Sequence, residues 1–186
     1  MKILKIIGII LLALVVVLGI VIAMQPAKGH IEKSIVINAA PAVVYRELNG
    51  FATMTKWSPW AKMDTATQYV FEGPQSGVGA RVNWDGPEVG KGSQWIDESI
   101  ENQRINCQLK FDGYDGKASA TFILSPDGQG TNVVWTYDGA NDGITGKAMW
   151  LMMRSMMPGL YTQGLVDLKT YIENLPPTSS DSTVMQ

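Results

Sequence analysis

The chain has 186 residues, with 15 Lys and Arg against 17 Asp and Glu, so its formal net charge at pH 7 is −2. This balance and the lack of a basic block argue against a nucleic-acid partner. A single cysteine excludes an internal disulfide, and a single histidine leaves no cluster of metal ligands. We therefore expect no metal and no other cofactor.

The N-terminal segment predicts a membrane anchor. Residues Ile6 to Met24 include no charged side chain and are nearly all Ile, Leu, Val and Ala. As a helix, this run spans roughly 28 Å, close to the ~30 Å hydrocarbon core of a bilayer. Lys2 and Lys5 precede it, and positive charge on that flank favours a cytoplasmic N-terminus. We predict a single-pass anchor over residues 1–25 in the cytoplasmic membrane, with the soluble domain outside the cytoplasm.

The alternative is a cleaved signal peptide, which would leave a secreted protein. Such peptides have an apolar stretch of about 7–15 residues and a small-x-small cleavage site. Here the apolar stretch is longer, and Val21 to Ala27 contains no clean site. In both cases the bulk of the chain is exported.

The rest of the chain divides into three parts. We expect a linker over residues 26–30, one domain over residues 31–175 and a disordered tail over residues 176–186, which begins with two prolines and is rich in Ser and Thr. A domain of this size can bury a core without disulfides.

The pattern within the domain begins with a strand over Ile31–Ile37 and a helix that starts at Pro41. A Trp-rich stretch follows, and then a series of strands. Strands are predicted over Gly79–Asp85, Lys91–Ser99, Arg104–Phe111, Lys117–Leu124 and Thr131–Tyr137. Alternation in Arg104–Phe111 places Cys107 on the inward face with Ile105, Leu109 and Phe111.

One long helix is predicted over Ile144–Leu175. Leu165, Leu168, Ile172 and Leu175 form an apolar stripe in its second half, while its first half is Met-rich and apolar nearly all round. Pro158-Gly159 should break or kink it. A strand, a helix, a strand meander and a last helix indicate an α+β fold in which one sheet packs on one helix.

Several motifs in this order resemble the START-like or SRPBCC superfamily, and in particular bacterial proteins called polyketide cyclase/dehydrase and lipid transport. The matching residues are Ile35 to Pro41 with Val44, Trp57 to Trp60, Gly77, Gly79, Trp84, Gly86, Gly90, Gly92, Gly130-Thr131 with Val133 and Trp135, and Gly164-Leu165 with Leu168-Lys169 and Glu173. The resemblance implies a helix-grip fold, a curved antiparallel sheet wrapped around a long C-terminal helix. It also implies a cavity between them, which in related proteins takes lipids, sterols or polyketides.

Catalytic chemistry finds little support in the residues. His30 lies beside the anchor, so neither a Ser-His-Asp nor a Cys-His arrangement is expected. Asp97 and Glu98 are neighbours on a strand and point to opposite faces, which excludes a carboxylate dyad. We predict no catalytic residue.

The informative side chains are apolar, with six Trp and ten Met in the chain. Met packs adaptably and suits the wall of an apolar cavity. The candidate cavity residues are Trp57, Trp60, Trp84, Trp135, Tyr137, Met149, Met153 and Met156. Two other interpretations stay open: a solid core, or an exposed patch around Trp150 that touches the bilayer or a partner.

The leading hypothesis is a membrane-anchored binding protein that holds a hydrophobic, lipid-like molecule between the sheet and the last helix. One alternative is a polyketide cyclase-like enzyme that uses the same cavity. The other is a protein-interaction module of the cell envelope.

Overall fold

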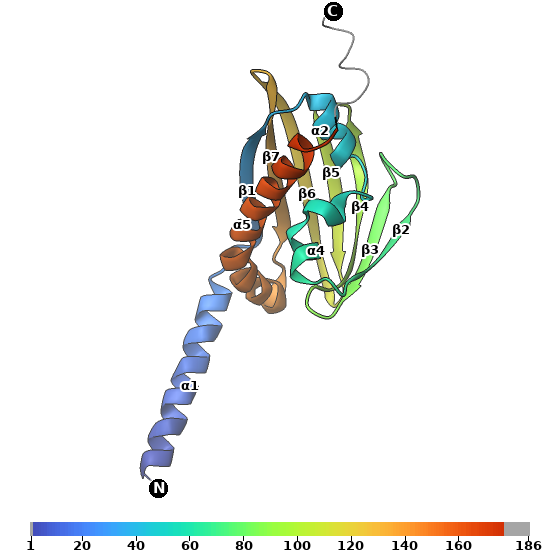
Figure 1. Ribbon diagram of the computed structural model, residues 1–186. Coiled ribbons are helices and arrows are strands. Elements are labelled where there is room, and N and C mark those ends of the chain that lie inside the picture. Colours follow the sequence, from blue (N-terminus) through green and yellow to red (C-terminus); the bar gives the residue numbers. More distant parts are fainter. Residues whose placement is uncertain (1, 177–186) are drawn as a thin grey trace, which may run out of the picture.

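The computed structural model describes residues 2–176. All but the first residue of the predicted tail over 176–186 therefore lies outside the described residues. The elements in chain order are α1 (Lys2–Ala23), β1 (Lys28–Ile37), α2 (Pro41–Leu48), α3 (Met54–Trp57), α4 (Pro59–Met63), β2 (Gln68–Glu72), β3 (Arg81–Gly86), β4 (Gly90–Ile100), β5 (Arg104–Phe111), β6 (Tyr114–Asp127), β7 (Gly130–Ala140) and α5 (Gly143–Glu173) (Figure 1).

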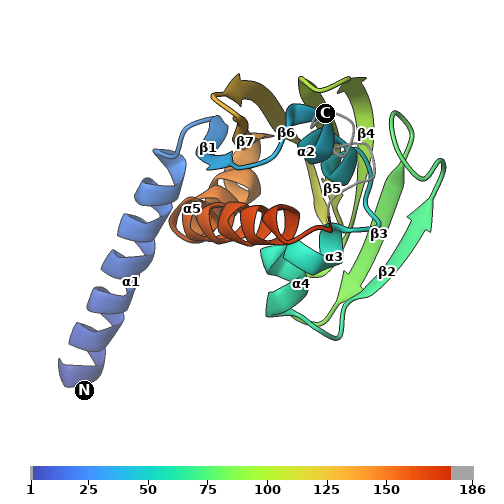
Figure 2. The same cartoon turned by 45° about the horizontal axis from the view of Figure 1, so that its top comes forward.

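The strands form one antiparallel sheet in the order β1-β7-β6-β5-β4-β3-β2. Strands β2 to β7 follow one another as a meander, and β1 joins the far edge by pairing with β7. The sheet curves, and α5 lies against its concave side together with the short helices α2, α3 and α4 (Figure 2). This is the predicted α+β helix-grip fold, which is confirmed.

The alternation in the strands places the core on the concave face. Cys107 on β5 pairs with Ala120 on β6, which in turn pairs with Tyr137 on β7, and all three are buried. Trp135 lies two residues before Tyr137 on the same face and is 4% exposed. Of the inward positions predicted for β5, Ile105 and Cys107 are buried, and Leu109 and Phe111 are half-buried.

Helix α5 closes the core from the other side. Leu165, Leu168 and Ile172 are at most 3% exposed, which confirms these three positions of the predicted stripe. The fourth, Leu175, lies beyond the end of α5 at Glu173 and is half-buried. The helix continues through Pro158 from Gly143 to Glu173, so it does not break there. It bends instead, and its two halves run in different directions (Figures 1 and 2). Proline lacks the amide hydrogen and its ring crowds the preceding turn, which favours such a bend.

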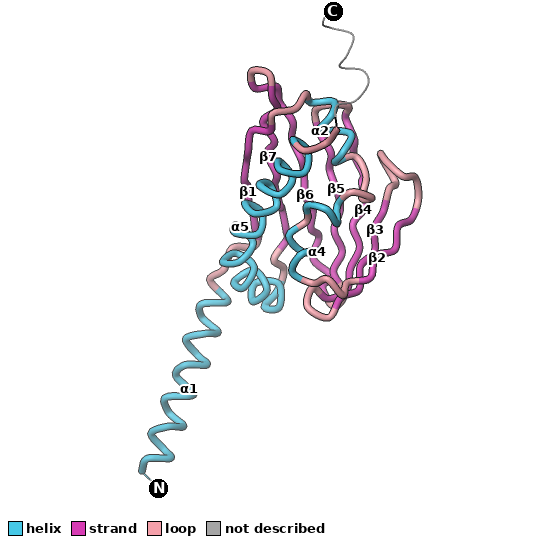
Figure 3. The backbone as a smooth tube through the Cα atoms, in the orientation of Figure 1, coloured by secondary structure: helices cyan, strands magenta, loops and turns pink. Residues whose placement is uncertain are grey.

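Four elements, three of them short, differ from the sequence-based expectation. Strand β2 was not predicted, because this edge strand is exposed or half-buried throughout and shows no inward alternation. Helices α3 and α4 have four and five residues, too few to show a helical period. Strand β1 begins at Lys28, three residues earlier than predicted, so the connection from α1 is short (Figure 3).

Helix α1 extends away from the domain and is long and apolar enough to cross a membrane, with a mean hydropathy of 3.4 over its best window. Its C-terminal end is tied to α5. Lys147 Nζ donates to the carbonyl oxygen of Ala23 at 2.7 Å, and Arg154 Nη1 donates to Gln25 Oε1 at 2.9 Å. These bonds fix the first half of α5 beside the end of α1.

Candidate functional site

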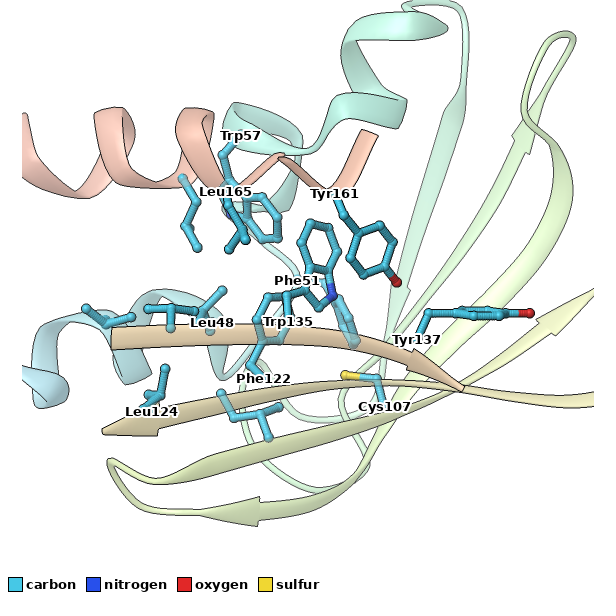
Figure 4. Close-up of a cluster of buried hydrophobic side chains, with 14 of the residues drawn as sticks. Leu48, Phe51, Trp57, Cys107, Phe122, Leu124, Trp135, Tyr137, Tyr161 and Leu165 are labelled. Carbon is cyan, nitrogen blue, oxygen red and sulfur yellow. The ribbon is translucent and has the colours of Figure 1, made fainter. Parts of the chain in front are cut away.

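A cavity of about 50 Å³ lies between α3, α4 and the concave face of the sheet. The segment from α2 to α4 forms one side and strands β4 to β7 form the other. Its lining consists of Leu48, Gly50, Phe51, Met54, Trp57, Ser58, Trp60, Gln94, Cys107, Phe122 and Trp135. Figure 4 shows Phe51, Trp57, Phe122 and Trp135 converging on this region from different elements.

Trp135 is the centre of the aromatic packing around the cavity. Its ring stacks on Phe122, with centroids 5.0 Å apart, and on Tyr161 of α5, with centroids 4.1 Å apart. Trp57 and Trp60 meet the same ring edge-on, each at 5.7 Å. Offset stacking and edge-to-face contacts are the favoured geometries for aromatic pairs. The helices α3 and α4 are therefore joined to the sheet and to α5 through one indole.

Three of the eight predicted cavity residues lie in this lining, namely Trp57, Trp60 and Trp135. Tyr137 is buried farther along β7, where its ring stacks on Trp150 with centroids 6.4 Å apart. Trp84 on β3 is half-buried and packs edge-on against Phe111 at 5.8 Å. Neither of these two lines the cavity.

The three predicted methionines also lie outside the lining. Met149 and Met153 are half-buried on α5, and Met156 is 46% exposed. Met157 occupies the inward position at this level and is 6% exposed, so its neighbour Met156 turns outward. Contact between any of the eight candidates and a ligand stays a prediction.

The sequence reasoning missed other lining residues. Cys107 and Phe122 lie at inward positions of predicted strands, so their alternation carried the signal. Phe51 and Met54 precede the first Trp in a stretch without periodicity, and no pattern marks them. Ser58 and Gln94 are polar, so a search for apolar side chains passes over them.

None of the described residues that line the cavity is charged. Burial raises the pKa of the Cys107 thiol to about 12, and it raises the pKa of the neighbouring Tyr161 phenol well above its usual value. Both groups are neutral at pH 7. The described lining is thus uncharged, and five of its eleven residues are aromatic.

Two buried polar atoms at the cavity have no hydrogen-bond partner within the described part of the chain. They are the indole nitrogens of Trp57 and Trp135. An indole N–H can only donate. Two residues of the lining thus carry an indole N–H group that has no acceptor among residues 2–176.

His30 lies elsewhere, on the exposed face of β1, with its Nδ1 2.7 Å from Asp138 Oδ1. A second hollow, of about 320 Å³, is close to it and is lined in part by Lys28, Lys117 and Asp138. Asp138 alternates with the buried Tyr137, which places this charged hollow on the outer face of the sheet. It is separate from the aromatic cavity.

The curved sheet packed on the long C-terminal helix defines a protein of the helix-grip class. The apolar cavity lies beside this helix, beneath α3 and α4, and α5 contributes none of the described lining residues. The family described as polyketide cyclase / dehydrase and lipid transport matches residues 28–173, and the chain belongs to this family. It is part of the START-like or SRPBCC superfamily, which confirms the resemblance drawn from the sequence. Among curated proteins, none matches this chain.

Solved structures share the fold at low sequence identity. Protein CV1439 from Chromobacterium violaceum is 22% identical, with a TM-score of 0.56 over 78% of this chain and 98% of that one. The Aha1 dimer from Colwellia psychrerythraea is 19% identical, with a TM-score of 0.57 over 78% and 97%. The di-domain ARO/CYC StfQ from the steffimycin biosynthetic pathway is 11% identical, with a TM-score of 0.59 over 79% and 52%. At these identities the likeness shows the fold alone.

Proposed function

We propose that the chain is a membrane-anchored binding protein that holds an apolar, lipid-like molecule in the cavity beneath α3 and α4. The observation that carries the proposal is the uncharged lining, rich in aromatic rings, of the cavity between α3, α4 and the sheet. Binding sites for apolar ligands are concave and mostly apolar, with a few polar groups that fix orientation. The description of the family, which includes lipid transport, agrees with this kind of ligand.

The cavity must widen to admit such a molecule. Its volume of about 50 Å³ is below the roughly 300–1,000 Å³ typical of ligand pockets. The elements that can yield are α3 and α4, each little more than one helical turn, joined at Ser58. Isolated turns gain little from helix formation and belong to the parts of a fold that open most easily.

Two outer contacts hold α3 and α4 against α5. Lys62 Nζ on α4 lies 2.7 Å from Asp167 Oδ2 on α5, with the lysine side chain 54% exposed and the aspartate side chain 13% exposed. Lys56 on α3 lies over the ring of Tyr171 on α5, 5.4 Å from its centroid, and a cation–π contact at an exposed site contributes about 0.5–1 kcal/mol. Opening therefore requires both contacts to break and the aromatic rings below to separate.

The position of the first half of α5 supports exchange of the ligand at a bilayer. The first half of α5 lies at the end of the domain from which α1 extends (Figure 1). Two of its residues, Ile144 and Met152, are 75% and 64% exposed. Burying apolar surface in the interfacial region of a bilayer is favourable by roughly 25 cal/mol per Å². We propose that α1 spans the membrane and that this face of α5 rests on the bilayer surface.

Photo-crosslinking in membranes tests the proposal. The full chain is incubated with a fatty acid methyl ester that has a mid-chain diazirine and a terminal alkyne, and the adducts are mapped by peptide mass spectrometry. Adducts on α1 are expected in any case, because α1 meets lipid. The proposal requires a second set on lining residues such as Met54 or Trp57. Adducts restricted to α1 and to the exposed side of α5 would contradict ligand binding in the cavity.

A further inference from the structure

Two residues of the cavity lining carry buried indole N–H groups without an acceptor among residues 2–176. Trp57 and Trp135 are 5% and 4% exposed, and their ring centroids are 5.7 Å apart. They come from α3 and β7, which are far apart in the sequence and lie close together in the fold. Buried polar groups nearly always have a partner, and an unpaired one calls for an explanation. A partner that enters the cavity from outside the chain is one explanation.

That partner must accept hydrogen bonds. The remaining polar groups of the lining are Ser58, Gln94 and the neutral thiol of Cys107. No Lys, Arg or His is among the described lining residues to neutralise an anion. A carboxylate or phosphate would enter either charged and without a counter-ion, or after taking up a proton, and both are unfavourable at pH 7. A carbonyl oxygen has two lone pairs and no net charge, so it matches two N–H donors.

We infer that the cavity takes the carbonyl group of an uncharged apolar molecule, such as a ketone or an ester, with the indole N–H groups of Trp57 and Trp135 as donors. The inference rests on the proposed function and names its ligand class. The present space suits the carbonyl end of a ligand, and the rest of the ligand requires the opening of α3 and α4.

NMR of the full chain in detergent micelles tests the inference, because the indole N–H signals of the six Trp report hydrogen bonding directly. Three probes of one ring size are compared, namely cyclohexanone, cyclohexane and cyclohexanecarboxylate, with the free aqueous concentration of each measured. The signals are assigned with single Trp→Phe variants.

We expect cyclohexanone to move the indole protons of Trp57 and Trp135 downfield in a saturable way. It should bind about tenfold more tightly than cyclohexane, which corresponds to a net hydrogen-bond contribution of about 1.4 kcal/mol. The carboxylate should bind more weakly than the ketone. Trp135→Phe should remove most of the preference for the ketone over cyclohexane.

Trp60→Phe is the matched control. Trp60 lines the same cavity and packs on the same ring, but its indole nitrogen is not among the buried unpaired atoms. This variant should keep the preference. Binding of cyclohexane to each variant shows whether the cavity has survived the substitution.

The outcomes separate the inference from the proposed function. If cyclohexane binds as tightly as cyclohexanone, the cavity takes apolar ligands but the carbonyl assignment is wrong, and the donors are then paired with water. If the carboxylate binds as tightly as the ketone, the preference for an uncharged ligand is wrong. If no probe perturbs the lining, the proposed function fails with the inference.

Discussion

Replacing Cys107 with Met tests whether the cavity is space that a side chain can use. Cys107 is 2% exposed and lines the cavity, and Met adds two heavy atoms at this position. If the cavity accepts them, burial of two methylene-sized groups contributes about 1.6 kcal/mol, at about 0.8 kcal/mol each. At about 2–4 °C per kcal/mol for a chain of this size, the Tm should rise by about 3–6 °C.

If the core is solid at this position, Cys107→Met should lower the Tm instead of raising it. Overpacking costs about 1–3 kcal/mol, which would lower the Tm by about 2–12 °C. Ala120→Val is the matched control, because Ala120 pairs with Cys107 across β5 and β6, is buried, does not line the cavity and also gains two heavy atoms. Thermal unfolding of the full chain in detergent, followed by circular dichroism, measures both. A loss of Tm in Cys107→Met as large as in Ala120→Val would refute the reasoning.

Three further predictions concern the fold and its setting. Leu168→Asp places an unpaired charge at a position with no exposed surface, so thermal unfolding should show a loss of several kcal/mol in stability. Val166→Asp, at a position that is 43% exposed, should leave the Tm nearly unchanged. Equal effects of the two substitutions would show that this face of α5 is not core. Asp64 accepts hydrogen bonds from three backbone amides in the turns after α4 and after β3, and although desolvation raises its pKa, these bonds hold the pKa below the ordinary 3.8. Its contribution to stability is therefore present above pH 3.8 and is lost as the pH falls through the lower folded pKa, so a plot of Tm against pH should be flatter in this range for Asp64→Asn. In bilayer nanodiscs, a nitroxide at Met152→Cys should be more accessible to oxygen than to a water-soluble nickel chelate, and one at Gln163→Cys should show the reverse; matching accessibilities would argue against a bilayer contact of α5.

The sequence predicted the parts of the fold that depend on regular alternation. Ile105 and Cys107 on β5, and Leu168 on α5, lie where the periods of strand and helix place them. The Met-rich half of α5 gave no such guidance, because a helix that is apolar all round does not indicate which side faces the core. Met156 therefore looked equivalent to Met157, and only the packing distinguishes them.

The cavity itself could be predicted only in part. Trp57 and Trp135 were candidates from their residue type and from the family resemblance, but the contact between them depends on how the α3–α4 segment folds over the sheet. That segment has no period to read, since its two helices are each shorter than two turns. The unpaired N–H groups are likewise a property of the packed structure. No sequence pattern distinguishes them from the N–H group of Trp60.

Trp57 and Trp135 lie in elements that we expect to differ in mobility, so a ligand bound to both should restrict the motion of α3. Trp57 is the last residue of α3 and moves whenever that helix opens, whereas Trp135 is fixed in β7 between two neighbouring strands. A carbonyl oxygen that accepts from both would therefore hold α3 onto the sheet. A small ligand that enters while α3 and α4 are open, and that α3 can then close over, stabilises the closed state by RT ln(1 + [L]/Kd), about 2.7 kcal/mol at one hundred times the dissociation constant.

Hydrogen exchange measures this effect directly. At saturating cyclohexanone, the backbone amides of residues 54–63 should exchange up to about a hundredfold more slowly, while those of the β6 and β7 strands should change little. Cyclohexane at the same fractional occupancy should give weaker protection of residues 54–63, because it fills the space without joining the two indoles. Equal protection by both probes would mean that filling the cavity, rather than bridging Trp57 to Trp135, is what closes α3 and α4.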